Sequence, residues 1–367
     1  MKLTGIQPKL PSPQRLVIML CIIKLASALF ATLVFSRFSP LVDAQLYLQG
    51  FYAIDLHWRT RIVQHLANLA NGVGGELFTH WVFGMVSCAG LLYYYLTGGK
   101  RWIVMLALLL PSAMVWTSIV GKEALFFGAF TLVLVVWSRF AISRLTLTDI
   151  LALLGSSIVC AVLRPHYAVA IIWLFGSLAL AKKLGGRAWP ILAIAWCAAA
   201  LIVYVYVWPD LLARGWGAIE PAARASRFVL FDMPPYTSEG FDKFKAWVVL
   251  GGIVGIVGPL PQEVVSRPEF LPFFVEGVLL LLFPPGICFY VLYCRPELKK
   301  EFLGKFFLCL APAIVALMLL HAPFGLLNPG SATRWRVNFE AIFYLAPLLL
   351  LFRLEDAARC EDSAFSS

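Results

Sequence analysis

Long uninterrupted stretches of apolar side chains recur along the chain, and they restrict its fold more than any other feature of the sequence. The stretches 16–35, 78–97 and 271–293 each carry at most one acidic or basic residue, and each is long enough to cross the hydrocarbon core of a bilayer as a helix. None shows the two-residue alternation of a barrel strand. Because a backbone in lipid must satisfy its own hydrogen bonds, we expect membrane-spanning helices.

The composition indicates the same class of protein. Hydrophobic residues make up 61% of the 367 residues, charged residues make up 14%, and the mean hydropathy is +0.83. Soluble domains are typically about half apolar and a quarter charged. The sequence therefore predicts an all-α, polytopic transmembrane helical bundle of about ten to eleven spans. The predicted spans lie near 16–35, 78–97, 102–120, 123–138, 148–163, 167–181, 188–208, 271–293, 306–322 and 337–352, with 246–261 as an eleventh, short segment.

The segment 246–261 leaves two interpretations open, because it is apolar but short and ends at Gly258-Pro259-Leu260-Pro261. It either spans the membrane or dips into it and returns as a re-entrant segment. Basic residues of short loops favour the cytoplasmic side. The basic loop 295–305 lies on that side only if 246–261 is re-entrant, so we favour the re-entrant interpretation.

The same distribution of basic residues predicts the domain organisation, with the N- and C-termini in the cytoplasm. We expect residues 1–353 to form a single transmembrane domain with two external loops, 36–77 and 209–245. The remaining residues, 354–367, are predicted to form a short cytoplasmic tail.

The net charge of +10 and the eight cysteines have simple explanations in such a chain. The charge fits basic cytoplasmic loops better than a nucleic-acid partner, and we expect no such partner. The cysteines are scattered, without a CxxC motif or a Cys/His cluster. We therefore predict no disulfide framework, no metal site and no cofactor.

Several charged residues are predicted at the outer ends of different spans, where they oppose the insertion signal and are candidates for function. Each also has a structural interpretation as a snorkelling side chain, a helix terminator or an interfacial anchor. Together they predict an outward-facing basic pocket for a lipid-linked phosphate or diphosphate, because guanidinium groups bind phosphate oxygens in pairs. The candidates are Asp43, Arg59, Lys122, Glu123, Arg164, His166, Arg334 and Arg336, with Asp55, His57, Glu220 and Arg224 among further loop residues.

A series of short motifs adds a resemblance to these predictions. The series begins with Pro111-Ser112, Trp116, Ser118 and Gly121-Lys122-Glu123. It continues with Arg164-Pro165-His166, with Gly258-Pro259-Leu260-Pro261, and with Asn328 and Arg334-x-Arg336. In order and placement this series is similar to the Wzy-like polysaccharide polymerases, including the EpsG-like group, of bacterial exopolysaccharide and O-antigen clusters. The resemblance runs from about residue 40 to about residue 350.

This resemblance implies an enzyme of the bacterial inner membrane that joins undecaprenyl-diphosphate-linked repeat units at the periplasmic face, alongside other polysaccharide-assembly proteins. GT-C glycosyltransferases share an early acidic residue in the first external loop, which would be Asp43 here. Two positions depart from the family pattern: Glu123 stands where Asp is frequent, and Trp335 where Tyr is common. They leave open whether the chain is a polymerase or a single-sugar transferase.

The expected mechanism divides the candidates into two groups. Asp43, Glu123 and His166 are candidate catalytic bases for the acceptor proton. The substrate-binding cations, which stabilise the leaving diphosphate in place of a metal, are predicted to be Lys122, Arg164, Arg334 and Arg336, with Arg59 in reserve. Alternatives are a GT-C-type transferase that moves one sugar from polyprenyl phosphate to a lipid or protein acceptor, a transporter of lipid-linked oligosaccharides, and a structural membrane subunit. The chain lacks the paired halves typical of a transporter.

Overall fold

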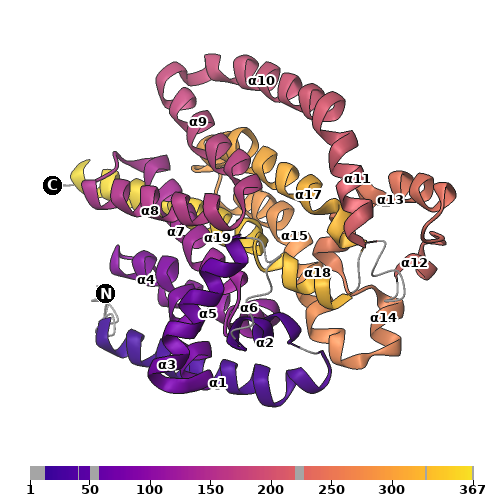
Figure 1. Ribbon diagram of the computed structural model, residues 1–367. Coiled ribbons are helices and arrows are strands. Elements are labelled where there is room, and N and C mark those ends of the chain that lie inside the picture. Colours follow the sequence, from indigo (N-terminus) through magenta and orange to yellow (C-terminus); the bar gives the residue numbers. More distant parts are fainter. Residues whose placement is uncertain (1–12, 40, 50–57, 220–226, 327–328, 366–367) are drawn as a thin grey trace.

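The computed structural model describes residues 13–39, 41–49, 58–219, 227–326 and 329–365, and in these ranges the chain forms helices and no strand. Figure 1 shows the helices gathered around α7 and α19. The all-α, polytopic helical bundle predicted from the sequence is confirmed.

The N-terminal part is built from short and bent helices. α3 is broken at Gly75, whose φ of +77° is accessible to glycine but strained for other residues, and α3 meets α4 at an angle of 45°. The elements are α1 (Pro13–Leu33), η1 (Phe35–Arg37), α2 (Val42–Leu48), α3 (Trp58–Ser87), α4 (Ala89–Leu96), α5 (Arg101–Leu109) and α6 (Pro111–Trp116).

The middle part contains a long peripheral arch. Consecutive helices fill Pro165–Gly217 with a turn at Gly185, whose φ is +56°. Only 6% of the most apolar window of this stretch is buried, so most of its apolar side chains are available to lipid. Figure 1 shows α10 as the outermost helix of this arch. The elements are α7 (Lys122–Ile142), α8 (Leu147–Leu163), η2 (Pro165–Tyr167), α9 (Ala168–Leu184), η3 (Gly185–Arg187), α10 (Ala188–Ile202), η4 (Val203–Val207) and α11 (Trp208–Ile219).

The C-terminal part returns to the centre of the bundle. Its last helix extends through most of the predicted tail 354–367, which is therefore helical as far as Phe365. The elements are α12 (Arg227–Leu230), α13 (Ser238–Val257), α14 (Pro261–Ser266), η6 (Pro268–Phe270), α15 (Leu271–Cys294), α16 (Lys299–Lys305), η7 (Phe306–Leu310), α17 (Ala311–Gly325), α18 (Pro329–Arg336) and α19 (Glu340–Phe365).

The number of spans differs from the prediction. Among the described residues, six helices are long and apolar enough to cross a membrane, or seven if the bent pair α3–α4 is one span. The predicted span 102–120 contains two short helices, because Leu110, before Pro111, is extended. The span predicted at 148–163 is the 17-residue helix α8. Those predicted at 167–181 and 188–208 correspond to α9 and to α10 with η4, which a turn at Gly185 separates.

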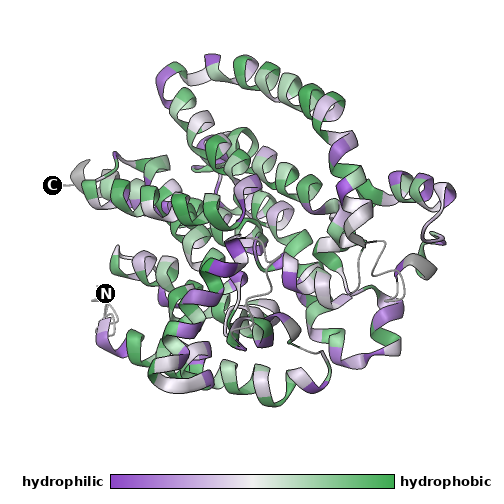
Figure 2. Ribbon diagram, in the orientation of Figure 1, coloured by the Kyte–Doolittle hydropathy of each residue, from purple (hydrophilic) through white to green (hydrophobic). Residues whose placement is uncertain are grey.

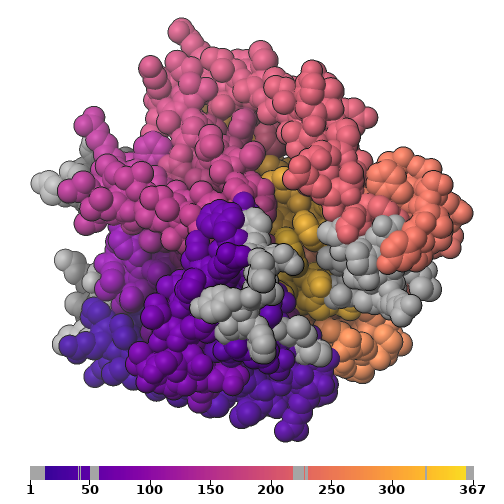
Figure 3. All heavy atoms as spheres, viewed as in Figure 1, coloured from indigo at the N-terminus to yellow at the C-terminus, as the bar shows by residue number. Residues whose placement is uncertain are grey.

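Two helices form the buried centre. In their most apolar windows 72% of the residues of α7 and 89% of those of α18–α19 are buried, against 28% for α1 and α15. Figure 2 shows that apolar residues cover most of the length of the central helices. In Figure 3 the gold C-terminal segment is visible only in a recess between the N-terminal half and α11. α7 and α18–α19 are therefore the core helices, around which the other elements pack.

The two ends of α7 carry separate charged clusters. Lys122 and Glu123 begin the helix, whereas Arg139, near its other end, binds Asp149 at 2.7 Å. The seventeen residue steps from Lys122 to Arg139 correspond to about 26 Å of helix rise, roughly the thickness of a hydrocarbon core. The residues predicted at the outer face thus lie at one end of α7, and a predicted cytoplasmic residue lies at the other.

The loop 295–305 lies at the end of the bundle where α7 carries Arg139. Glu355 forms ion pairs with Arg295 at 3.2 Å and with Lys100 at 3.8 Å, so the C-terminal end of α15 lies beside the connection before α5. This is the side that the re-entrant interpretation of 246–261 requires. The segment itself is helical as far as Val257, as the second part of α13. The predicted external loop 209–245 is also partly helical, because it includes most of α11, α12 and the start of α13.

Candidate functional site

Four charged side chains from different elements meet at the start of α7. Oε1 of Glu123 accepts hydrogen bonds from Arg164 Nη2 at 2.9 Å and from Arg334 Nε at 3.1 Å. Arg334 Nη1 also lies 2.5 Å from Oδ2 of Asp43 in α2. Arg334, in α18, therefore bridges two carboxylates. The structure brings these four predicted residues into one cluster.

Glu123 is the buried centre of this cluster. Only 3% of the residue is exposed, and a carboxylate removed from water in this way needs opposite charges beside it. Arg164 and Arg334 provide them from two sides. The geometry of Glu123 suits a residue that orients both guanidinium groups.

Asp43 differs from Glu123 because it can be reached from outside. Its side chain is 47% exposed, and it lines a cavity while one of its oxygens is held by Arg334. A carboxylate that is fixed in direction and open to a ligand suits a general base. Of the predicted bases, Asp43 has the placement that best fits this role.

Tyr47 is a further residue of the cluster that the sequence alone did not assign. It lies one helical turn after Asp43 on α2 and is 2% exposed. Burial, with a smaller contribution from the nearby charge of Glu123, raises the pKa of Tyr47 well above its ordinary value. Its phenol stays protonated and can donate a hydrogen bond. The four-residue spacing from Asp43 was the one signal in the sequence.

Lys122 and Arg59 mark the side of the cluster where α3 and α7 begin. Lys122 Nζ donates to Thr60 Oγ1 at 2.8 Å, and Arg59 lies over the ring of Trp58 at 5.4 Å. Lys122 is close enough to Arg164 for their charges to interact. Positive charge therefore continues from the carboxylates towards α3.

An aromatic group supports Arg164 from the other side. Its guanidinium carbon lies 4.5 Å from the ring centroid of Trp335, a cation–π distance, and Trp335 stacks on Phe324 with centroids 3.9 Å apart. The Trp at this position thus fixes the direction of Arg164. In the sequence alone, Trp335 stands out only as a departure from a family pattern.

His166 lies with two other rings. It packs 5.6 Å from the buried His321 and 5.0 Å from Tyr167. Tyr167 Oη and His321 Nε2 are hydrogen-bonded at 3.0 Å. The contacts of His166 are thus with a buried aromatic group, and this placement favours a packing role over that of a base.

Arg336 is separated from the cluster, although it is only two residues from Arg334. It is fully buried, and its two Nη atoms donate to three carbonyl oxygens, of Ile256, Gly258 and Phe273, and to the side chains of Ser112 and Glu276. Residues two apart on a helix point in different directions. Its predicted substrate contact does not fit this placement, because its Nη donors are used to join α6, α13, α15 and α18.

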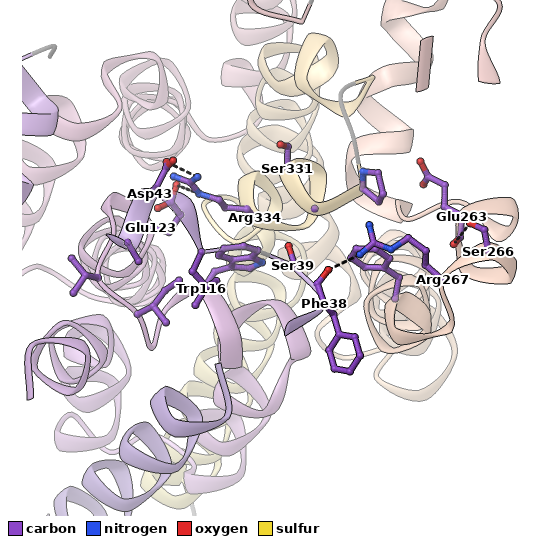
Figure 4. A pocket seen from close by; sticks show the side chains of 17 residues that line it. Phe38, Ser39, Asp43, Trp116, Glu123, Glu263, Ser266, Arg267, Ser331 and Arg334 are labelled. Atoms are coloured by element: carbon purple, nitrogen blue, oxygen red, sulfur yellow. Dashed lines mark hydrogen bonds and ion pairs between the residues drawn. The ribbon is translucent and has the colours of Figure 1, made fainter. Parts of the chain in front are cut away.

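A cavity of about 590 Å³ opens beside the cluster. Figure 4 shows Asp43, Glu123 and Arg334 together at one end, with Trp116 below them. Ser331 lines the cavity between this end and the opposite one. The size and mixed lining are those of a site for an organic ligand with several polar groups.

The opposite end of the cavity is built by α14. Glu263 is held by the buried Arg227 through two bonds of 2.7 Å. Arg267 donates to the carbonyl oxygen of Phe38 at 2.6 Å and lies over the ring of Phe270 at 4.5 Å. These contacts connect α14 to η1, so the far wall has fixed hydrogen-bonding groups (Figure 4).

Some predicted residues cannot be assigned to the site. Asp55, His57, Glu220, Arg224 and Asn328 lie outside the described residues. Within the ranges that the structure describes, no group of three or more His, Cys, Asp or Glu side chains is arranged to hold a metal ion.

Searches of the chain against protein-family models, curated proteins and solved structures each found no match.

Proposed function

We propose that the protein is a glycosyltransferase of a bacterial inner membrane that joins glycan units linked to polyprenyl diphosphate, and so acts as a polysaccharide polymerase. The observation that carries the proposal is the bridge from Asp43 through Arg334 to Glu123 and Arg164, at the end of a ligand-sized cavity. The motif resemblance supports the choice of substrate.

The proposed reaction is a displacement at the anomeric carbon of the donor sugar. A hydroxyl oxygen of the acceptor forms the new bond to this carbon, and its proton passes to the carboxylate of Asp43. The bond between the anomeric carbon and the diphosphate oxygen breaks, and the electron pair remains on the diphosphate. A base of this kind typically contributes about 10²–10⁴-fold to the rate.

The cations supply the second part of the catalysis. Negative charge grows on the departing diphosphate, and fixed guanidinium groups in a site of low dielectric constant stabilise it strongly. Arg164 and Arg334 are fixed in this way, because each is bound to Glu123 and Arg164 also lies against Trp335. Lys122 extends the same positive region.

The cavity suits the sugar part of the substrate. The indole of Trp116 offers an apolar face, while Asp43, Ser331 and Glu263 offer polar groups at separate points of the wall. Ligand sites commonly combine aromatic walls with a few placed polar groups. Such a wall can orient one hydroxyl of an acceptor towards Asp43.

The test is Asp43→Asn, which keeps the shape of the side chain but removes the base. We expect at least a 100-fold loss of glycan transfer, measured with purified protein and a lipid-linked glycan, or as the loss of long chains on a gel of cellular glycan. Normal levels of the variant in the membrane would show that it is inserted.

The matched control is Asp232→Asn. Asp232 is a 90% exposed aspartate that pairs with Lys243 away from the cavity, and asparagine tolerates its positive φ. The control should transfer glycan normally. Full-length glycan from Asp43→Asn would exclude the proposed base, and a product extended by a single sugar would indicate a single-sugar transferase instead.

A further inference from the structure

An apolar groove of about 470 Å³ lies on the surface of the bundle between α3, α4, α7 and α8. Of the sixteen residues that line it, only Ser156 has a polar side chain. Several of the lining residues are small, among them Ala129, Ala152 and Gly155. Figure 2 shows that α7 and α8 are apolar over most of their length. Along α8 the lining extends from Leu151 to Leu163, about 18 Å of helix rise.

One end of this groove coincides with the charged cluster. Leu125 lies three residues after Lys122 on α7, and Ile62 lies three residues after Arg59 on α3, so each cation is one turn from a groove residue on the same helix face. Leu163, at the end of α8, directly precedes Arg164. Three helices thus bring positive charge to the same end of the groove.

The charges around Glu123 favour an anionic ligand. Among the described residues, the cations Lys122, Arg164 and Arg334 lie beside two carboxylates, Asp43 and Glu123. Guanidinium and ammonium groups bind phosphate oxygens, so an anionic headgroup would find donors at this end of the groove.

We infer that this groove binds the isoprenoid chain of a single-chain lipid diphosphate, with the diphosphate at the Lys122 and Arg164 end. The inference rests on the proposed function and specifies its donor site. Glu123 then lies where the two sites adjoin, because it lines the polar cavity and also binds Arg164 at the head of the groove. The donor sugar enters the cavity from this end, and its anomeric carbon meets the acceptor hydroxyl beside Asp43.

The shape of the groove favours one chain over other occupants. Its walls belong to neighbouring helices of one bundle, and Gly155 leaves room that a bulky side chain would fill, because a Cβ atom there would meet no heavy atom within 4 Å. The cations stand at one end only, which fits a molecule with one anionic head and one apolar chain. A bulk phospholipid and a second copy of this chain are the competing occupants, and the test distinguishes them.

The test uses Gly155→Phe in the full-length protein purified in detergent. A Cβ atom at Gly155 would meet no heavy atom within 4 Å, so the ring can fill the groove without disturbing the fold. The matched control is Gly176→Phe, at an exposed position of α9 that also has open space and lines neither the groove nor the cavity. The probes are geranylgeranyl diphosphate, inorganic diphosphate and phosphatidylglycerol, with binding measured by native mass spectrometry and titration.

We expect Gly155→Phe to weaken geranylgeranyl diphosphate binding at least tenfold and to leave inorganic diphosphate binding unchanged, while Gly176→Phe binds both as the unmodified protein does. Equal binding of geranylgeranyl diphosphate by Gly155→Phe would overturn the inference. Competition by phosphatidylglycerol at equal concentration would identify a groove for bulk lipid. A dimer that Gly155→Phe dissociates would identify a protein interface.

The outcome is separate from that of the proposed function. If Asp43→Asn abolishes glycan transfer while Gly155→Phe binds geranylgeranyl diphosphate normally, the proposed reaction is supported and the groove assignment is wrong. If Gly155→Phe loses binding of geranylgeranyl diphosphate while Asp43→Asn leaves glycan transfer unchanged, the lipid site is supported and the proposed reaction is wrong.

Discussion

At the scale of single residues, Glu123 determines the arrangement of the charged cluster. One of its oxygens holds two guanidinium groups, from elements that are distant in the sequence. Arg334 then reaches Asp43 with another of its nitrogens. The direction of the exposed carboxylate therefore depends on a buried one, and the base and the cations of the proposed reaction are fixed together.

Glu123→Gln tests this dependence. The amide keeps the shape but takes the paired carboxylate from the buried Arg164 and leaves Arg334 with Asp43 alone, so we expect a loss of about 1–3 kcal/mol of stability together with loss of activity. The measurement is thermal unfolding in detergent alongside glycan transfer.

The control for this change is Glu297→Gln at the other end of the bundle. Glu297 is 55% exposed and forms a loose pair of 3.7 Å with Arg295, and such surface pairs contribute roughly 0–1 kcal/mol. If both variants unfold at the same temperature, Glu123 does not organise the cluster.

At the scale of elements, glycines set the crossing of α13 and α17. A Cβ atom at Gly325 would lie 1.8 Å from the carbonyl oxygen of Gly251, and Gly255 packs against Gly325 as well. The four-residue spacing of Gly251 and Gly255 is typical of close helix contacts in membranes. The crossing supports the site, because Arg227, which holds Glu263 of the cavity wall, also donates to the carbonyl oxygen of Gly325.

Gly325→Ala should force these helices apart. We expect destabilisation of about 1–3 kcal/mol, the usual cost of overpacking, seen as a lower unfolding temperature in detergent. Gly286→Ala on α15 is the control, since its Cβ would meet no heavy atom within 4 Å. Equal unfolding temperatures of the two variants would contradict the close crossing.

The sequence predicted elements better than it predicted the site. Long apolar runs gave α1, α7 and α15 close to their observed bounds, because length and hydropathy define such helices locally. The break at Pro111 could have been recognised, since a residue before proline avoids helical geometry. The different surroundings of Arg334 and Arg336 could not be predicted from the sequence, because tertiary packing decides which face of α18 meets the cavity.

At the scale of the whole molecule, buried polar contacts fix the connection that leads into α7. Lys24 of α1 donates to Thr117 Oγ1 at 2.5 Å, and the backbone N–H of Val120 donates to His80 Nδ1 at 2.9 Å. These contacts hold the residues before Lys122 from two sides. The charged cluster therefore rests on a rigid support, which is what a preorganised site requires.

The separation of charged clusters along α7 makes a prediction about the orientation of the whole bundle. The cavity and Lys122 lie at one end, while Arg139, Lys100 and Glu355 lie at the other. If the proposed function is correct, the cavity opens outside the cytoplasm. Ser266, which is exposed and lines the cavity, and Ser143, which is exposed after the end of α7, are suitable reporters of the two sides.

The test starts from a chain in which serine replaces the exposed cysteines Cys197, Cys294 and Cys360. In this chain, Ser266→Cys and Ser143→Cys should differ in labelling by a membrane-impermeant maleimide. We expect Ser266→Cys to react in intact spheroplasts and Ser143→Cys only after the membrane is opened, because one bilayer separates the two ends of α7. A permeant maleimide that labels both variants equally provides the control for accessibility. The reverse pattern would place the charged cluster in the cytoplasm, where a periplasmic polymerisation reaction is impossible, while labelling of both positions from outside would contradict a membrane-spanning α7.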